Sequence, residues 1–162
     1  MINLFTEEHQ ELLSVLVKHK VDFMLVGGYA VIHYGYDRTT GDMDIWLQTG
    51  NENRDKLVAA LQNFGVTDEN IDVLRQMDFT RPVPVFSLGK EPRRIDFITL
   101  ISNITFDEAI NQVNHIRLDV IEVPVIHYNH LLASKLSSTR LKDKADVEEL
   151  QKINKYRKGG NK

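Results

Sequence analysis

Apolar and polar residues recur along the chain with two periods, one typical of helices and one typical of strands. Leucine and valine side chains repeat at helical spacing over residues 12–17, after Thr6, which suits a helix N-cap. The segment "DMDIWLQ" (residues 42–48) instead alternates residue by residue. That alternation predicts a strand with one apolar face and one face that carries two aspartates.

The same two patterns predict the remaining elements. Helices are expected over residues 6–18, 28–34, 52–64, 69–77, 105–113, 128–138 and 142–156. Strands are expected over residues 21–26, 42–48, 83–88 and 93–100, and residues 115–126 read as two short strands or one bent strand. The basic tail, residues 157–162, is expected to fray.

Strands that alternate with helices, some of them adjacent in sequence, predict an α/β or α+β fold. Such a fold places helices against a sheet, here with additional C-terminal helices. The sequence shows no repeat, linker or low-complexity segment. We therefore expect a single domain over residues 1–162, with a helical part from about residue 127.

Composition narrows the range of functions. The chain has 162 residues, a formal net charge of −3 and no cysteine. The absence of cysteine excludes disulfides, zinc-thiolate sites and thiol nucleophiles, and the charge argues against wholesale coating of nucleic acid. A signal peptide and a membrane-spanning stretch are not expected, so a cytoplasmic protein is the default prediction.

Asp42 and Asp44 are the first candidates for chemistry. Strand alternation places both carboxylates on one face, where they repel each other unless a cation joins them. Two acidic ligands on a rigid element suit Mg²⁺, which completes its shell with water and phosphate oxygens. The alternative is a surface strand with two solvated aspartates.

Two further features combine with this pair. Gly27 and Gly28 lie where a strand gives way to a helix, so that their backbone amides can approach a phosphate; a plain tight turn is the alternative. Asp96 lies between apolar residues of a predicted strand, on the same face as Arg94. It would complete a three-carboxylate cluster of the two-metal kind, or form a salt bridge with a neighbouring arginine.

These blocks, "VGGYAVIHYGYDRTTGDMDIWL" followed by "RRIDFI", resemble the nucleotidyltransferases of the DNA polymerase β superfamily. Together with the later "LLASKL" and "RLKDKADVEEL", they look most like its bacterial branch of toxin-type and uncharacterised small enzymes. The resemblance implies a nucleotidyltransferase-like mixed sheet flanked by helices. It also implies an enzyme that transfers a nucleoside monophosphate from an NTP to an acceptor hydroxyl and releases pyrophosphate.

The resemblance also assigns roles to residues. Asp42 and Asp44 would bind Mg²⁺ and through it the triphosphate, and Asp96 would complete the site of two Mg²⁺ ions and help to deprotonate the acceptor. The nucleotide-binding residues would be Gly27, Gly28, Arg38, Thr40 and Lys135. For Lys135, a solvated helix face is an equal alternative. The chain departs from many members at Tyr29, where those members carry a serine.

Other functions compete with this interpretation. A catalytically inactive member of the fold could bind nucleotide or a partner protein, as in a toxin–antitoxin pair, and a metal-dependent glycosyltransferase could also use Asp-x-Asp. The acceptor could be a small molecule, a protein side chain or a tRNA end. His127 and His130 lack zinc-site spacing and are expected to have cap or surface roles. Nothing in the sequence specifies an oligomeric state.

Overall fold

The computed structural model describes residues 4–160, which form seven helices and a six-stranded mixed sheet. The strand order is β3-β4-β2-β1-β6-β5. Two pairs, β1–β6 and β2–β4, are parallel, and the other three are antiparallel. The strands are β1 (Phe23–Val26), β2 (Asp42–Leu47), β3 (Phe86–Leu88), β4 (Arg94–Ile98), β5 (Asn114–Leu118) and β6 (Ile121–Val125). The predicted fold class is confirmed.

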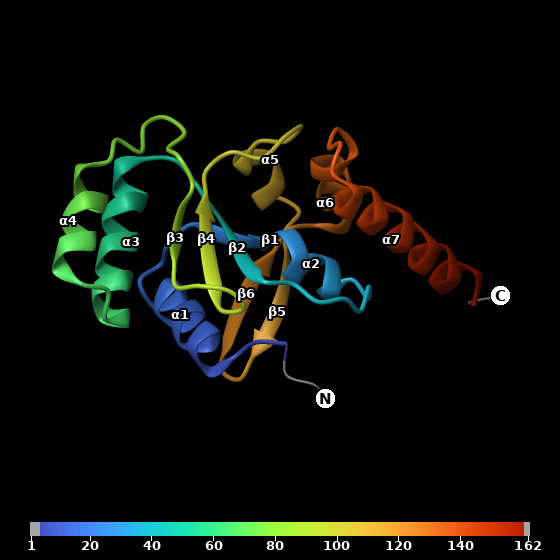
Figure 1. Ribbon diagram of the computed structural model, residues 1–162, viewed down its shortest axis with the longest axis horizontal. Coiled ribbons are helices and arrows are strands. Elements are labelled where there is room, and N and C mark those ends of the chain that lie inside the picture. Colours follow the sequence, from blue (N-terminus) through green and yellow to red (C-terminus); the bar gives the residue numbers. More distant parts are fainter. Residues whose placement is uncertain (1–3, 161–162) are drawn as a thin grey trace.

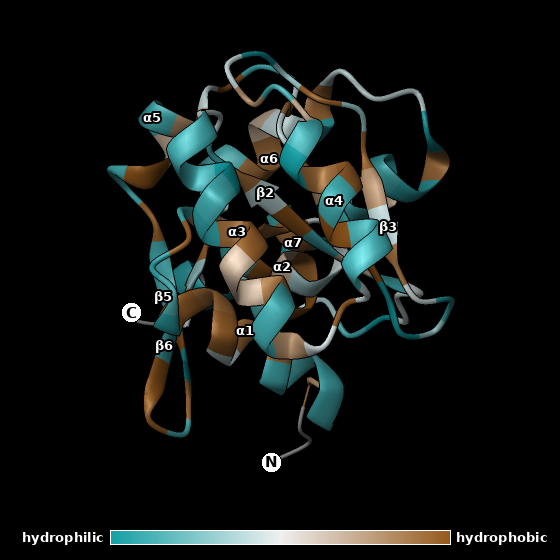
Figure 2. Ribbon diagram, turned by 90° about the vertical axis from the view of Figure 1, so that its left-hand side faces the viewer, coloured by the Kyte–Doolittle hydropathy of each residue, from teal (hydrophilic) through white to brown (hydrophobic). Residues whose placement is uncertain are grey.

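The helices lie on both sides of this sheet. They are α1 (Glu7–Lys18), α2 (Gly27–His33), α3 (Asn51–Phe64), α4 (Asp68–Gln76), α5 (Phe106–Ile110), α6 (Tyr128–Leu136) and α7 (Leu141–Gly159). Figures 1 and 2 show α1, α3 and α4 on one side and α2, α6 and α7 on the other. None of the helices within residues 4–160 has the length and apolar composition needed to cross a bilayer.

The alternation of β2 positions the two aspartates. Met43, Ile45 and Leu47 are fully buried on one face, where the hydrophobic segments of α1 and α3 meet the strands (Figure 2). The opposite face carries Asp42 and Asp44, which remain partly exposed. Hydrophobic burial of the first face therefore fixes the direction of both carboxylates.

Local signals in the sequence set several helix ends. The Thr6 side chain caps α1 by accepting from the His9 N–H at 3.2 Å, and Thr105 and Glu108 form the predicted capping box of α5. Gly65 ends α3 at a φ of 102°, a conformation that favours glycine. The expectation of a cap role for His127 is confirmed, since its side chain accepts from the Asn129 N–H at the start of α6.

Some predicted bounds are wrong. The strand expected over residues 83–88 begins only at Phe86, because Pro84 has no N–H and the Val83 N–H binds the Thr99 side chain. The helix expected over residues 105–113 ends at Ile110, and the chain turns into β5 at Asn114. Residues 115–126 contain two strands, most of β5 and all of β6, that pair antiparallel.

The predicted fraying of the tail is also wrong for its first half, residues 157–159. Helix α7 continues to Gly159, and Figure 1 shows it running unbroken to the edge of the molecule. The side chains of Ile153 and Arg157 lie against the turn at Gly35, which gives this part of the helix a tertiary contact. Residues 161–162 lie outside the described residues.

Candidate active site

Three carboxylates meet on one face of the sheet. Asp42 and Asp44 lie on β2, and the parallel neighbour β4 places Asp96 opposite Asp44 in register. One ligand oxygen from each of the three residues lies within 4.8 Å of the others. The sequence-predicted juxtaposition of these aspartates is therefore observed, and it is the one such cluster of three or more acidic or histidine side chains found within residues 4–160.

The cluster is electrostatically strained. Burial, followed by the nearby carboxylates of Asp42 and Asp96, raises the pKa of Asp44 to about 7, although Lys135 and Arg140 oppose the rise. A carboxyl in this position is ionised at a high cost unless positive charge is close by. A donor set of three carboxylate oxygens is the kind that Mg²⁺ or Mn²⁺ prefers, so the residues fit a divalent cation.

Arg94 supplies part of that positive charge. Its Nη2 donates to Asp42 Oδ2 at 2.7 Å, and its Nε lies 3.2 Å from Asp96 Oδ1. Asp96 also accepts a short hydrogen bond from the Ser87 hydroxyl on β3. The arginine salt bridge considered as an alternative for Asp96 thus coexists with the acidic cluster.

Gly27 and Gly28 lie directly beside the cluster, where they begin α2. Gly27 has a φ of +63°, and a Cβ there would overlap the Asp44 carboxylate. A Cβ at Gly28 would lie 2.5 Å from the Thr40 hydroxyl. The glycines therefore allow the backbone to approach β2 and the loop before it more closely than any other residue could.

Tyr29, at the position where the family resemblance implies a serine, is buried in the core. Its side chain is 6% exposed and stacks on Phe5 with a centroid distance of 5.3 Å. Its hydroxyl lies 3.2 Å from His9 Nδ1, and burial lowers the pKa of that histidine. Tyr29 belongs to the core, so a hydroxyl contact to the site from this position is not available.

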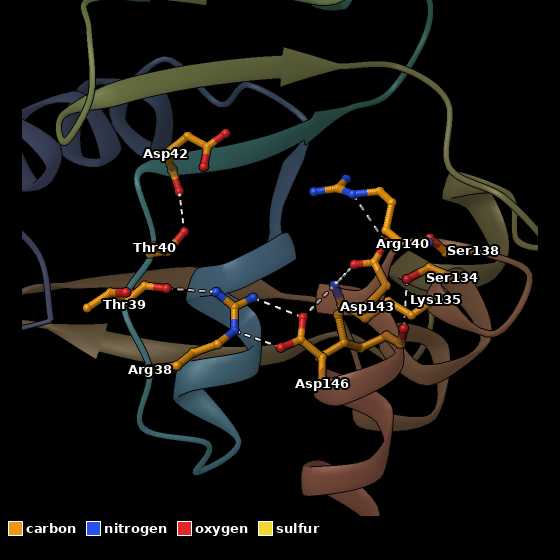
Figure 3. A network of polar contacts seen from close by, with 11 residues as sticks. Arg38, Thr39, Thr40, Asp42, Ser134, Lys135, Ser138, Arg140, Asp143 and Asp146 are labelled. Carbon is orange, nitrogen blue, oxygen red and sulfur yellow. Dashed lines mark hydrogen bonds and ion pairs between the residues drawn. The ribbon is translucent and has the colours of Figure 1, made fainter.

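The opposite wall of the site is basic (Figure 3). Arg38 donates to the fully buried Asp146 carboxylate through Nε at 2.7 Å and Nη2 at 2.9 Å. Lys135 Nζ lies 2.7 Å from Asp143 Oδ1 and 3.0 Å from Asp146 Oδ2. Burial works against ionisation of Asp143, but hydrogen bonds from Lys135 and Ser138 outweigh it and lower its pKa. Helix α7 thus holds two cations in fixed positions.

All eight sequence-predicted site residues line one cavity of about 410 Å³. The Thr40 hydroxyl donates to the Asp42 carbonyl at 3.1 Å, which ties the loop to β2. Arg94, Arg140, Lys142 and Asp143 also line this cavity, and Asp146 lies behind it. The sequence pattern pointed to Lys142 and Asp143 as further candidates beside Lys135, but it gave no site role to Arg94, Arg140 or Asp146. The sequence does carry a signal for the two aspartates of α7. Asp143 and Asp146 lie on the same helical face as the buried Leu150, so this face is expected to pack against the protein.

An acidic cluster that faces a basic wall, beside the N-terminus of a helix that begins with two glycines, suits a divalent cation together with an anionic ligand. The chain matches, over residues 5–161, the family described as "Nucleotidyl transferase of unknown function (DUF2204)". The match covers nearly the whole sequence, and the chain belongs to this family. No curated protein matches it.

Proposed function

We propose that the protein is a Mg²⁺-dependent nucleotidyltransferase of the bacterial branch of the DNA polymerase β superfamily. It would transfer a nucleoside monophosphate from an NTP to an acceptor hydroxyl, with pyrophosphate as the leaving group. The observation that carries the proposal is the meeting of Asp42, Asp44 and Asp96 opposite a wall of fixed cations. An anionic substrate and a divalent cation satisfy both walls of this cavity.

Each of the three aspartates has a role that follows from its position. Asp42 and Asp44 would hold the metal, and Asp96 would complete its shell and accept the proton of the attacking hydroxyl. When bound, Mg²⁺ supplies neutralisation of the phosphate charge and lowers the pKa of an oxygen that it coordinates. Catalysis would come mainly from positioning and from electrostatic stabilisation.

The basic wall and the glycines would bind the triphosphate. Arg38 and Lys135 are already oriented by Asp146, so little conformational entropy is lost when they contact an anion. The backbone at Gly27 and Gly28 borders the same cavity and, with Thr40, leaves room for phosphate oxygens beside Asp44. The interpretation of Lys135 as a phosphate ligand is supported by its place in the cavity wall.

Calorimetric titration with each NTP, with and without Mg²⁺, tests the proposal. The wild-type protein is expected to bind an NTP in the presence of Mg²⁺, and an Asp42→Ala/Asp44→Ala double variant is expected to lose that binding. Asp37→Asn, an exposed aspartate in the preceding loop, is the matched control and should bind as the wild type does. Equal binding by the double variant and the wild type would overturn the assigned site.

A further inference from the structure

Arg94 contacts carboxylate oxygens of Asp42 and Asp96 that a metal ion in this site would bind. It lies opposite Asp42 in the β2–β4 register and two residues from Asp96 on the same face of β4. Its guanidinium contacts one oxygen of each carboxylate, at 2.7 Å and 3.2 Å. In the protein as described, this side chain is the positive charge that holds two of the three aspartates together.

A divalent ion and this guanidinium compete for the same site. Mg²⁺ binds carboxylate oxygens at about 2.1 Å in a near-octahedral shell, which a guanidinium bound to the same oxygens obstructs. Two cations a few ångströms apart also repel each other. Metal binding in this place therefore requires Arg94 to move or to give up its contacts.

The Arg94 side chain has other possible partners in the cavity. Its side chain is 36% exposed and lines the same cavity as Arg38 and Lys135. Glu91, in the turn between β3 and β4, lies 3.7 Å from its Nη1. A triphosphate in the cavity would offer the planar guanidinium a pair of acceptor oxygens of the kind that arginine binds best.

We infer that Arg94 couples metal binding to triphosphate binding: it stands in for the metal in the free protein and moves onto the phosphates when metal and substrate arrive together. The inference rests on the proposed function and deepens it, because it concerns the same cavity. Its consequence is that the free protein binds metal weakly. Metal and triphosphate then each increase the affinity for the other by the same factor.

The test compares wild type with Arg94→Gln, which removes the charge at similar length. Arg93→Gln is the matched control, because Arg93 is the exposed neighbour on the same segment and makes the same change in net charge. Metal-free protein is titrated with Mn²⁺ and free Mn²⁺ is measured by electron paramagnetic resonance. The titration is repeated with inorganic triphosphate, which presents the phosphates without a base.

Arg94→Gln is expected to bind Mn²⁺ alone about tenfold tighter than wild type, because a competing cation is gone. The factor by which triphosphate tightens Mn²⁺ binding should fall at least about fivefold in this variant, while Arg93→Gln keeps both wild-type values. A gain in metal affinity is a readout that general structural damage does not produce. Arg94→Lys keeps the positive charge but loses the paired N–H donors of the guanidinium. Its Mn²⁺ affinity should lie between those of wild type and Arg94→Gln.

Two failures are distinguishable. If Arg94→Gln binds Mn²⁺ as weakly as wild type or more weakly, or if its coupling factor is unchanged, Arg94 merely supports the strands and the inference is overturned. If no variant binds Mn²⁺ with or without triphosphate, and wild type does not either, the proposed function fails and the coupling role fails with it. Arg94→Lys keeps the first comparison possible should Arg94→Gln not fold.

Discussion

Replacing Asp44 with asparagine should stabilise the metal-free protein, although the residue lies in the centre of the candidate site. Burial and the neighbouring carboxylates raise the pKa of Asp44 to about 7, from an ordinary value of 3.8. Between these two values the native state binds a proton that the unfolded state releases. The free energy of unfolding of the wild type therefore falls as pH rises through this window.

The size of the effect follows from the same shift. A pKa raised from 3.8 to about 7 costs the ionised native state at most about 4 kcal/mol at pH 8. Solvent screening and relaxation of a side chain that is not fully buried reduce this, so we expect Asp44→Asn to gain about 2 kcal/mol at pH 8. For a chain of this length, that gain corresponds to a rise in melting temperature of about 4–8 °C.

The assay is thermal unfolding in EDTA at pH 5 and pH 8. Asp44→Asn should melt above wild type at pH 8, and the difference should shrink at pH 5, where most of the wild-type carboxyl is protonated. In the presence of inorganic triphosphate at pH 8, adding Mg²⁺ should raise the melting temperature of wild type and leave the variant unchanged, because only the wild type would bind the ion. Asp37→Asn should follow wild type throughout. A variant that melts at or below wild type in EDTA at pH 8 would refute the electrostatic reasoning.

Three further predictions concern the same site. Mg²⁺-dependent NTP binding should strengthen about tenfold between pH 6 and pH 8 in calorimetry, because metal must displace the Asp44 proton; flat affinity would contradict this. Gly27→Ala should lower the free energy of unfolding by more than about 1 kcal/mol in urea titrations and abolish NTP binding, whereas Gly159→Ala, with open space around it, should change neither. Asp146→Ala should cost about 3–5 kcal/mol in the same titrations, because Arg38 loses its buried partner and Lys135 keeps only Asp143, against about 0.5 kcal/mol for the partly exposed Glu149→Ala; equal losses would show that the buried network contributes little.

Part of this site could be predicted from the sequence because strand periodicity is a local property. The alternation around Met43 places Asp42 and Asp44 on one face whatever the neighbouring strands are. That Asp96 joins them depends on β4 lying beside β2, a parallel pairing that strand patterns do not encode. The resemblance to a known family supplied that long-range information.

The basic wall was predicted less completely, because it depends on contacts between residues far apart in the sequence. The pairing of Arg38 with Asp146 spans 108 residues, and it exists because α7 packs against the loop before β2. Periodicity showed that α7 is a helix but not which of its faces is covered. Likewise, Arg94 was recognised as a partner for Asp96, whereas its bond to Asp42 depends on the register between two strands.

The proposed nucleotidyltransferase site has its most direct test in a crystal structure with Mn²⁺ and an NTP analogue whose α–β bridging oxygen is replaced by carbon. We expect an anomalous peak for Mn²⁺ bound by Asp42, Asp44 and Asp96, with the triphosphate extending toward Arg38 and Lys135. Mn²⁺ elsewhere, or a nucleotide bound away from the three carboxylates, would contradict this expectation.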